Sequence, residues 1–310
     1  MAGRPIIIDC DPGQDDAVML LLALAAPEEL DVLGITAVAG NVPLHLTQRN
    51  ARLMCELAGR TEVPVFAGCA RPMVRDLITA EAVHGKTGID GFEIYEPEMP
   101  LQGRHGVDFI VETLMAAGDG AITLVPTGPL TNIAMAFVKE PRVVGKVREI
   151  VLMGGAMRES GNTSASAEFN ILVDPHAAHV VFRCGRPITV MGLDVTHKAL
   201  TTPERLRAFK ALDTPVGRTI HAMLEFYDRH DMEKYGTAGG PLHDPCTIAF
   251  LLKPELFKAK RVNVEVEIHS ELTMGETAVD FWGVTGRPAN ADWVHAIDAD
   301  GFYALLLERI

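Results

Sequence analysis

The sequence lacks any local concentration of positive charge. Its 310 residues contain 28 Lys and Arg against 41 Asp and Glu, which gives a net charge of −13. A surface of this sign repels a phosphate backbone, and no basic run offsets it. We therefore do not expect a nucleic-acid partner.

Long apolar runs and cysteine motifs are missing as well. The longest apolar run, residues 17–26, is flanked by acids and is about half of the roughly 20 residues that cross a bilayer, so we predict a buried helix and no membrane association. No secretory signal precedes the strand-like residues 6–8. Five cysteines without a C-x-x-C pair argue against a disulfide framework and against zinc. We expect a cytoplasmic protein.

What the sequence does contain is an alternation of strand and helix patterns. Short apolar runs lead into turns with Gly or Asp and then into longer amphipathic stretches. The expected strands are residues 5–8, 33–38, 121–126, 149–153 and 188–192. Since no linker interrupts the pattern, we predict one α/β domain over residues 1–310, with a mostly parallel sheet and helices on both faces. Ligands bind such sheets outside the carboxyl ends of the strands.

Three segments depart from this rhythm. Residues 67–107 are rich in Gly and Pro, and we predict a lid loop there. Residues 215–243 begin with a helical stretch and end in a Gly-rich one, and we expect this segment to close over the site from the other side. Residues 262–269 and 277–282 alternate like the antiparallel strands of a hairpin around Gly275.

Four carboxylates, Asp9, Asp11, Asp15 and Asp16, stand within eight positions where an apolar strand ends. Two like charges about 4 Å apart repel by roughly 4 kcal/mol at an effective dielectric constant of 20. Helix capping uses one acid and does not account for four. A divalent cation relieves the repulsion, and a cluster without His or Cys favours Ca²⁺ or Mg²⁺ over Zn²⁺.

A fifth carboxylate, Asp244, follows His243, whose ordinary pKa of about 6.5 suits proton transfer at neutral pH. A surface or capping His-Asp pair is an equally good interpretation of these two residues. The turn at residues 126–132, Pro-Thr-Gly-Pro-Leu-Thr-Asn, frees backbone carbonyls for a hard cation, or is simply a strand-to-helix turn. Glu168-Phe169-Asn170, with Asn162 before it, suits a polyhydroxylated ligand, although such groups are common in loops.

Taken in this order, the motifs resemble the nucleoside hydrolase family, whose members cleave the N-glycosidic bond of ribonucleosides. The resemblance covers nearly the whole chain. It rests on the D-x-D-P-G-x-D-D start, Gly40-Asn41, Thr-Gly-Pro-Leu-Thr-Asn, Val-Leu-Met-Gly-Gly at residues 151–155, Glu-Phe-Asn followed by Asp174-Pro175, and His-Asp-Pro. It implies a Rossmann-like nucleoside hydrolase fold, bound Ca²⁺, and a homotetramer or homodimer.

The resemblance also implies roles for single residues. The Ca²⁺ ligands would be Asp11, Asp16, the Thr127 carbonyl and Asp244. The residues that hold the nucleoside would be Asp15, Asn41, His84, Met153, Asn162, Glu168, Phe169 and Asn170. Asp11 would be the general base, and His243 would protonate the leaving base. From its position at the end of the strand, and not from the resemblance, we expect Asp9 to orient the ligands without touching the ion.

Alternatives remain open both for the nucleoside base that the site prefers and for the class of reaction. The stretch Gly-Gly-Pro-Leu-His-Asp-Pro-Cys resembles pyrimidine-preferring members, and Tyr227, His230 and Tyr235 are candidates for base contacts. An apolar strand ending in D-x-D is also typical of Mg²⁺-dependent phosphatases with an aspartate nucleophile, in which Asp9 would be the nucleophile. A calcium-stabilised nucleoside-binding protein without catalysis is the non-enzymatic alternative.

Overall fold

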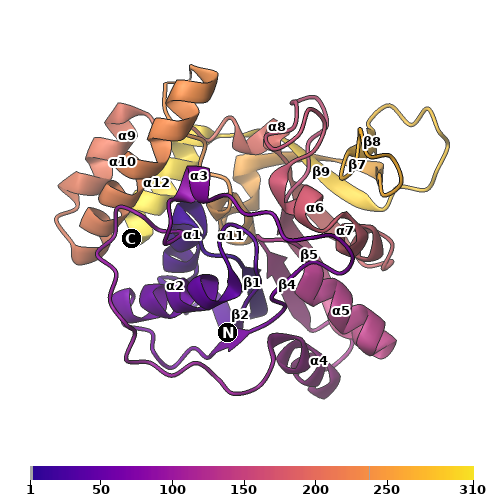
Figure 1. Cartoon of the computed structure of the whole chain (residues 1–310), viewed down its shortest axis with the longest axis horizontal. Helices are drawn as coiled ribbons and strands as arrows, with labels where there is room; N and C mark the ends of the chain where they lie inside the picture. Colours follow the sequence, from indigo (N-terminus) through magenta and orange to yellow (C-terminus); the bar gives the residue numbers. More distant parts are fainter. Residues whose placement is uncertain (1–2, 237) are drawn as a thin grey trace.

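The computed structural model describes residues 3–236 and 238–310, without the side chains of residues 230–235, and Figure 1 shows its arrangement. Within these residues one sheet has the strand order β3-β2-β1-β4-β5-β6-β9-β7-β8. The strands are β1 Arg4–Cys10, β2 Leu30–Ala37, β3 Val65–Ala67, β4 Ile122–Pro126, β5 Val147–Met153, β6 Ile188–Met191, β7 Phe257–Val266, β8 Thr277–Asp280 and β9 Ala291–Ile297. Pairing is parallel from β3 to β9, and β7 is antiparallel to β9 and β8.

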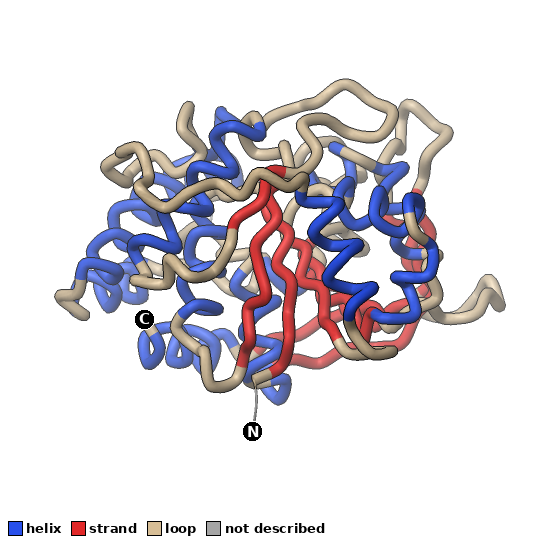
Figure 2. Tube along the Cα trace, turned by 90° about the horizontal axis from the view of Figure 1, so that it is seen from below, coloured by secondary structure: helices blue, strands red, loops and turns tan. Residues whose placement is uncertain are grey.

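Helices cover both faces of the sheet, as Figure 2 shows on either side of the strands. They are α1 Gln14–Leu24, α2 Leu44–Leu57, α3 Glu81–His84, α4 Gly106–Ala116, α5 Thr131–Lys139, α6 Phe169–Val173, α7 Pro175–Phe182, α8 Leu193–Thr196, α9 Pro203–Ala211, α10 Pro215–Tyr235, α11 Pro245–Leu252 and α12 Ala299–Arg309. None of those within the described residues is both long enough and apolar enough for a membrane span. The α/β prediction is confirmed.

Two hydrophobic clusters form the core, one on each face. Alternate residues of β1 supply them, because successive side chains of a strand point to opposite faces. Ile6 and Ile8 belong to the cluster that includes residues of α1, α11 and α12, whereas Ile7 belongs to the one that includes residues of α4, α5 and α7. Every residue of α1 is buried, as the apolar run at residues 17–26 predicts.

Two strands are absent from the sequence-based prediction. β3 has only three residues, too few for a periodic pattern, and β9 inserts between β6 and β7 from the far end of the chain. The predicted hairpin is confirmed. Val266 pairs with Thr277, and Gly275 between them has a φ of 78°, which glycine adopts without strain.

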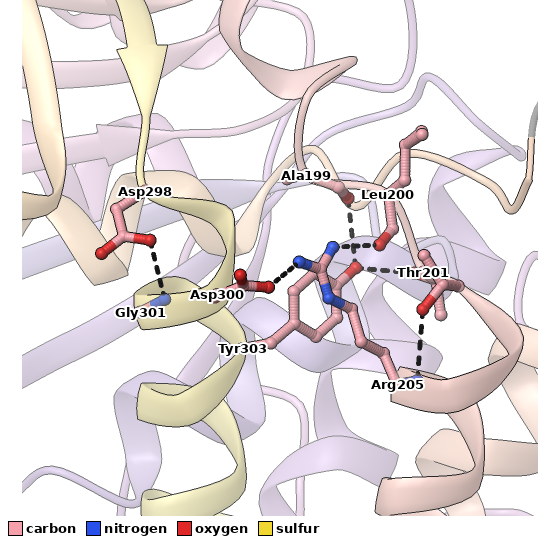
Figure 3. Close-up of polar contacts among 9 residues, drawn as sticks. Ala199, Leu200, Thr201, Arg205, Asp298, Asp300, Gly301 and Tyr303 are labelled. Carbon is pink, nitrogen blue, oxygen red and sulfur yellow. Dashed lines mark hydrogen bonds and ion pairs between the residues drawn. The ribbon is translucent and has the colours of Figure 1, made fainter.

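The C-terminal helix α12 contacts the loop at residues 199–201, as Figure 3 shows. The Tyr303 hydroxyl donates to the Ala199 carbonyl at 3.1 Å and lies 2.8 Å from Thr201 Oγ1. The Arg205 guanidinium stacks 4.3 Å above the Tyr303 ring. In turn, the Leu242 backbone N–H donates to Ala199 at 2.9 Å. The end of the chain thereby fixes the backbone immediately before His243.

Candidate active site

A cavity of about 90 Å³ lies at the carboxyl ends of the parallel strands. Every predicted site residue lines it except Asp11 and Asp16, which lie fully buried beneath. Its lining consists of Asp15, Asn41, Ala80, Val83, His84, Thr127, Met153, Asn162, Thr163, Glu168, Phe169, Asn170, His197, Tyr227, Pro241, His243 and Asp244. The fold thus gathers residues that are up to 229 positions apart, from Asp15 to Asp244.

Asp16 lies in the first turn of α1, and its carboxylate has more partners than a helix cap requires. One oxygen accepts from the Gly13 backbone N–H at 3.1 Å, which is the capping interaction. The other accepts from the Thr127 hydroxyl at 2.8 Å. Asn41 Nδ2 also donates to Asp16 at 3.3 Å. The carboxylate therefore connects the ends of β1 and β4 and the turn after β2.

Asp11 occupies a space that two glycines leave open. Its Oδ2 accepts from the Asn41 backbone N–H at 2.7 Å. A Cβ atom on Gly40 would lie 2.0 Å from Oδ2, and one on Gly128 would lie 2.5 Å from Oδ1. Oδ1 is buried without a hydrogen-bond partner among the described residues. A buried carboxylate oxygen without a partner is costly, so Asp11 is poised for a further ligand.

Asp15, Asp16 and Asp244 form a group that can hold a metal ion. Their closest oxygen atoms lie within 4.8 Å of one another, and all three residues are buried. Burial, followed by the charge of Asp16, raises the pKa of Asp15 to about 8, and burial raises that of Asp16 to about 6. An all-oxygen donor set of this charge fits a hard divalent cation. The group differs from the predicted ligand set in containing Asp15 and not Asp11.

Three further polar side chains of the cavity lining, those of Glu168, Asn170 and Asn162, are held by hydrogen bonds to the backbone. Glu168 caps α6 and accepts from the backbone N–H groups of Asn170 and Gly155, each at 2.9 Å. Asn170 Nδ2 donates to the Thr127 carbonyl at 2.7 Å. Asn162 Oδ1 accepts from the Phe169 N–H at 2.9 Å. These contacts fix the orientation of the carboxylate and the amides before any ligand binds.

Histidine and aromatic side chains form the remaining wall. His243 Nδ1 lies 2.7 Å from the Thr196 hydroxyl, and its ring centroid is 5.7 Å from that of His197. Burial lowers the pKa of His243 well below its ordinary value, and the charges of His197 and His84 lower it further. His84 stacks on Tyr227 at 5.4 Å. The side chains of His230 and Tyr235 lie outside the described residues.

The sequence-based prediction missed His197 and Thr163. His197 follows α8, directly after β6, at the same carboxyl edge of the sheet as the predicted motifs. The sequence feature that could have identified His197 is its position shortly after the predicted strand at residues 188–192. Thr163 directly follows Asn162 and carries no separate signal.

Asp9 lies at the end of β1 and is not part of the cavity lining. One of its carboxylate oxygens accepts from the Thr36 hydroxyl and, at 2.7 Å, from Asn132 Nδ2. Its backbone carbonyl accepts from the Thr127 N–H at 2.8 Å. Burial raises the pKa of Asp9 to about 7. These contacts tie together the ends of β1, β2 and β4, on which the acids and the Thr127 carbonyl stand.

Comparisons with known proteins place the chain among nucleoside hydrolases. Residues 6–304 match the model of the inosine-uridine preferring nucleoside hydrolase family. The chain is 46% identical over 307 residues to the pyrimidine-specific ribonucleoside hydrolase RihA of Escherichia coli, covering 99% of this chain and 98% of that one. A plant nucleoside hydrolase structure, PpNRh1, aligns with a TM-score of 0.91 and 31% identity over 99% of this chain and 98% of its own. The purine-preferring ribonucleoside hydrolase of Gardnerella vaginalis aligns with a TM-score of 0.91 and 32% identity over 98% and 97%.

Proposed function

Because the chain belongs to the inosine-uridine preferring nucleoside hydrolase family, we propose that it hydrolyses the N-glycosidic bond of ribonucleosides to ribose and free base. The observation that carries the proposal is the cavity itself, which is lined by buried carboxylates and oriented amides together with His and Tyr side chains. Members of the family are enzymes, so the chain is an N-glycosidase. The phosphatase and the non-enzymatic binding protein are therefore rejected.

We propose that the metal of this site is Ca²⁺, held by Asp11, Asp16, the Thr127 carbonyl and Asp244. The partnerless Oδ1 of Asp11 and the crowding of acids around Asp16 support this set. The oxygen-only donors fit a calcium ion better than a softer metal. When bound, the cation polarises substrate hydroxyls and makes water more acidic.

We assign the ribose to the acid and amide side of the cavity. Asp15, Asn41, Asn162, Glu168 and Asn170 supply the polar contacts there. The side chains of Met153 and Phe169 complete this part of the wall. Backbone N–H groups already fix the orientation of the Glu168 carboxylate. The negative charge of Glu168 can therefore stabilise the positive charge that develops on the oxocarbenium-like sugar.

Two proton transfers complete the reaction. Asp11 acts as the general base that accepts the proton of the attacking water. His243 acts as the acid toward the departing base. Its lowered pKa keeps the ring largely neutral near neutral pH, so His243 must first take up a proton, which the strongly acidic protonated ring then passes readily to the departing base.

For the base we propose a preference for uridine and cytidine over inosine. The 46% identity to a pyrimidine-specific hydrolase, against 32% to the purine-preferring structure, supports this preference. A panel of nucleosides, read out by release of the free base with calcium-loaded protein, tests both class and preference. Nucleosides left intact after long incubation would rule out hydrolysis, and faster inosine cleavage would reverse the preference alone.

We further propose that residues 67–107 form the lid and that residues 215–243 close the cavity from the other side. His84 on α3 and Tyr227 on α10 both line the cavity and stack on each other.

As the assembly of this protein we propose a homodimer or a homotetramer, and sedimentation velocity distinguishes the two. The cytoplasm is the proposed location, supported by five cysteines that are all free.

A further inference from the structure

Gln14 stands beside the acids of the cavity, yet within the described residues its side chain forms hydrogen bonds with the proposed lid. The residue is fully buried in the first turn of α1. Its Nε2 donates to the carbonyls of His84 at 3.0 Å and Asp90 at 3.1 Å. Its Oε1 lies 2.7 Å from His84 Nδ1. One side chain therefore joins the helix that carries Asp15 to a segment 70 residues further along the chain.

These contacts fix the position of a proton. Carbonyl oxygens only accept hydrogen bonds, so the amide nitrogen of Gln14 must be the atom that faces them. Its Oε1 then faces His84 Nδ1 and can only accept. Nδ1 must carry the hydrogen, and in the neutral ring Nε2 carries the lone pair. Gln14 thus selects one of the two tautomers of His84.

Neighbouring residues also restrict the edge and the face of the His84 ring. A Cβ atom on Gly13 would lie 2.4 Å from His84 Nδ1, so the ring packs directly against the turn before α1. Tyr227 stacks on the ring at 5.4 Å with an interplanar angle of 27°. His84 is only 6% exposed and lines the cavity together with Asp15 and Asn41. Little freedom is left for the ring to turn.

We propose that Gln14 is a positioning residue, which holds His84 over the cavity in its Nδ1-protonated form so that Nε2 accepts a hydrogen bond from an O–H or N–H group of the nucleoside. The proposal rests on the proposed function of this cavity. Gln14 acts through His84 and touches no substrate. Through this contact Gln14 makes His84 Nε2 a hydrogen-bond acceptor. The site thereby favours nucleosides that present a hydrogen-bond donor to Nε2.

The direct test is the tautomer of His84 in the calcium-loaded wild-type protein at pH 8. Two-bond ¹⁵N–¹H correlation spectra distinguish a protonated Nδ1 from a protonated Nε2. We expect protonation at Nδ1 alone in the wild type, and a mixture of tautomers in Gln14→Met, which keeps the length of the side chain without its polar atoms. Protonation of the wild-type ring at Nε2, or at both nitrogens, overturns the proposal.

Kinetics test whether the positioning matters for the substrate. Gln14→Met should raise KM for uridine about tenfold and change kcat less. The reason is that His84 Nε2 would no longer be held as a hydrogen-bond acceptor for the bound nucleoside. In a His84→Ala background the same substitution should change KM less than twofold, whereas a purely structural role would act equally in both backgrounds. The matched control is Gln48→Met, since among the described residues the Gln48 side chain donates only to its local His45 carbonyl, at 2.9 Å, and lies outside the cavity lining.

Failure of this inference differs from failure of the proposed function. Wild-type protein that cleaves no nucleoside refutes the function, while the spectra of His84 still decide the tautomer. Wild-type protein that cleaves uridine, with an unchanged KM in Gln14→Met, refutes the inference alone. If Gln14→Met does not fold, the wild-type spectrum remains decisive.

Discussion

Removal of the divalent cation should make the stability of this protein decrease as the pH rises. In the metal-free protein burial raises the pKa of Asp16 from 3.8 to about 6. A carboxyl group whose pKa is raised by folding contributes stability that is fully present below the unfolded pKa and lost as the pH rises through the folded pKa. The stability that Asp16 contributes is therefore lost between about pH 4 and about pH 6. Asp15, with a pKa of about 8, extends this pH range of decreasing stability to about pH 8.

The size of the effect follows from the same pKa values. For Asp16 alone the interval is about 2 pH units, which at about 1.36 kcal/mol per unit corresponds to about 3 kcal/mol. An unfolding entropy of about 2.1 cal/mol/K per residue gives roughly 0.65 kcal/mol/K for 310 residues. The loss for Asp16 therefore corresponds to a decrease in Tm of about 5 °C.

The assay is thermal unfolding followed by circular dichroism at pH 4.5, 6 and 7.5, once with chelator and once with excess calcium. We expect the calcium-dependent increase in Tm to grow with pH. Asp16→Asn should remove about 5 °C of the pH-dependent decrease in the chelated protein, whereas Asp31→Asn, at an exposed position of β2, should not. A calcium effect of equal size at pH 4.5 and 7.5, or a chelated wild type and Asp16→Asn with the same pH dependence, would refute the reasoning.

Three further predictions concern the catalytic groups. Asp11→Asn should lower uridine hydrolysis at least about 100-fold because the general base is lost, with an unchanged circular dichroism spectrum; residual turnover near the wild-type rate contradicts the role. His243→Ala should slow uridine about 100-fold more than an activated aryl riboside, and equal losses on both contradict leaving-group protonation. Gly128→Ala should displace Asp11 Oδ1, 2.5 Å from the new Cβ, and weaken calcium binding about tenfold in calorimetry, while Gly145→Ala, which has open space there, should not.

The order of the motifs along the chain was enough to predict the fold class and the family. Apolar strands that end in acids or glycines are local patterns, and in a parallel sheet their carboxyl ends meet at one edge. For this reason Asp11 and Thr127 could be placed near each other from the sequence, whereas Asp244, which precedes α11 and ends no strand, was placed there by the resemblance to the family. The burial of α1 from Ala17 to Leu24 followed equally from its uninterrupted apolar run.

Contacts between distant segments needed the tertiary structure. No local pattern pairs Gln14 with His84 or places His197 beside His243, because these contacts depend on how α1, α3 and α8 pack. The grouping of Asp15 with Asp16 and Asp244 depends likewise on where α11 begins against α1. The sequence alone determined which chemical groups stand at the sheet edge, since their positions follow from strand ends. Only the packing of helices decided which atoms face each other, since those distances are set by side chains far apart in the chain.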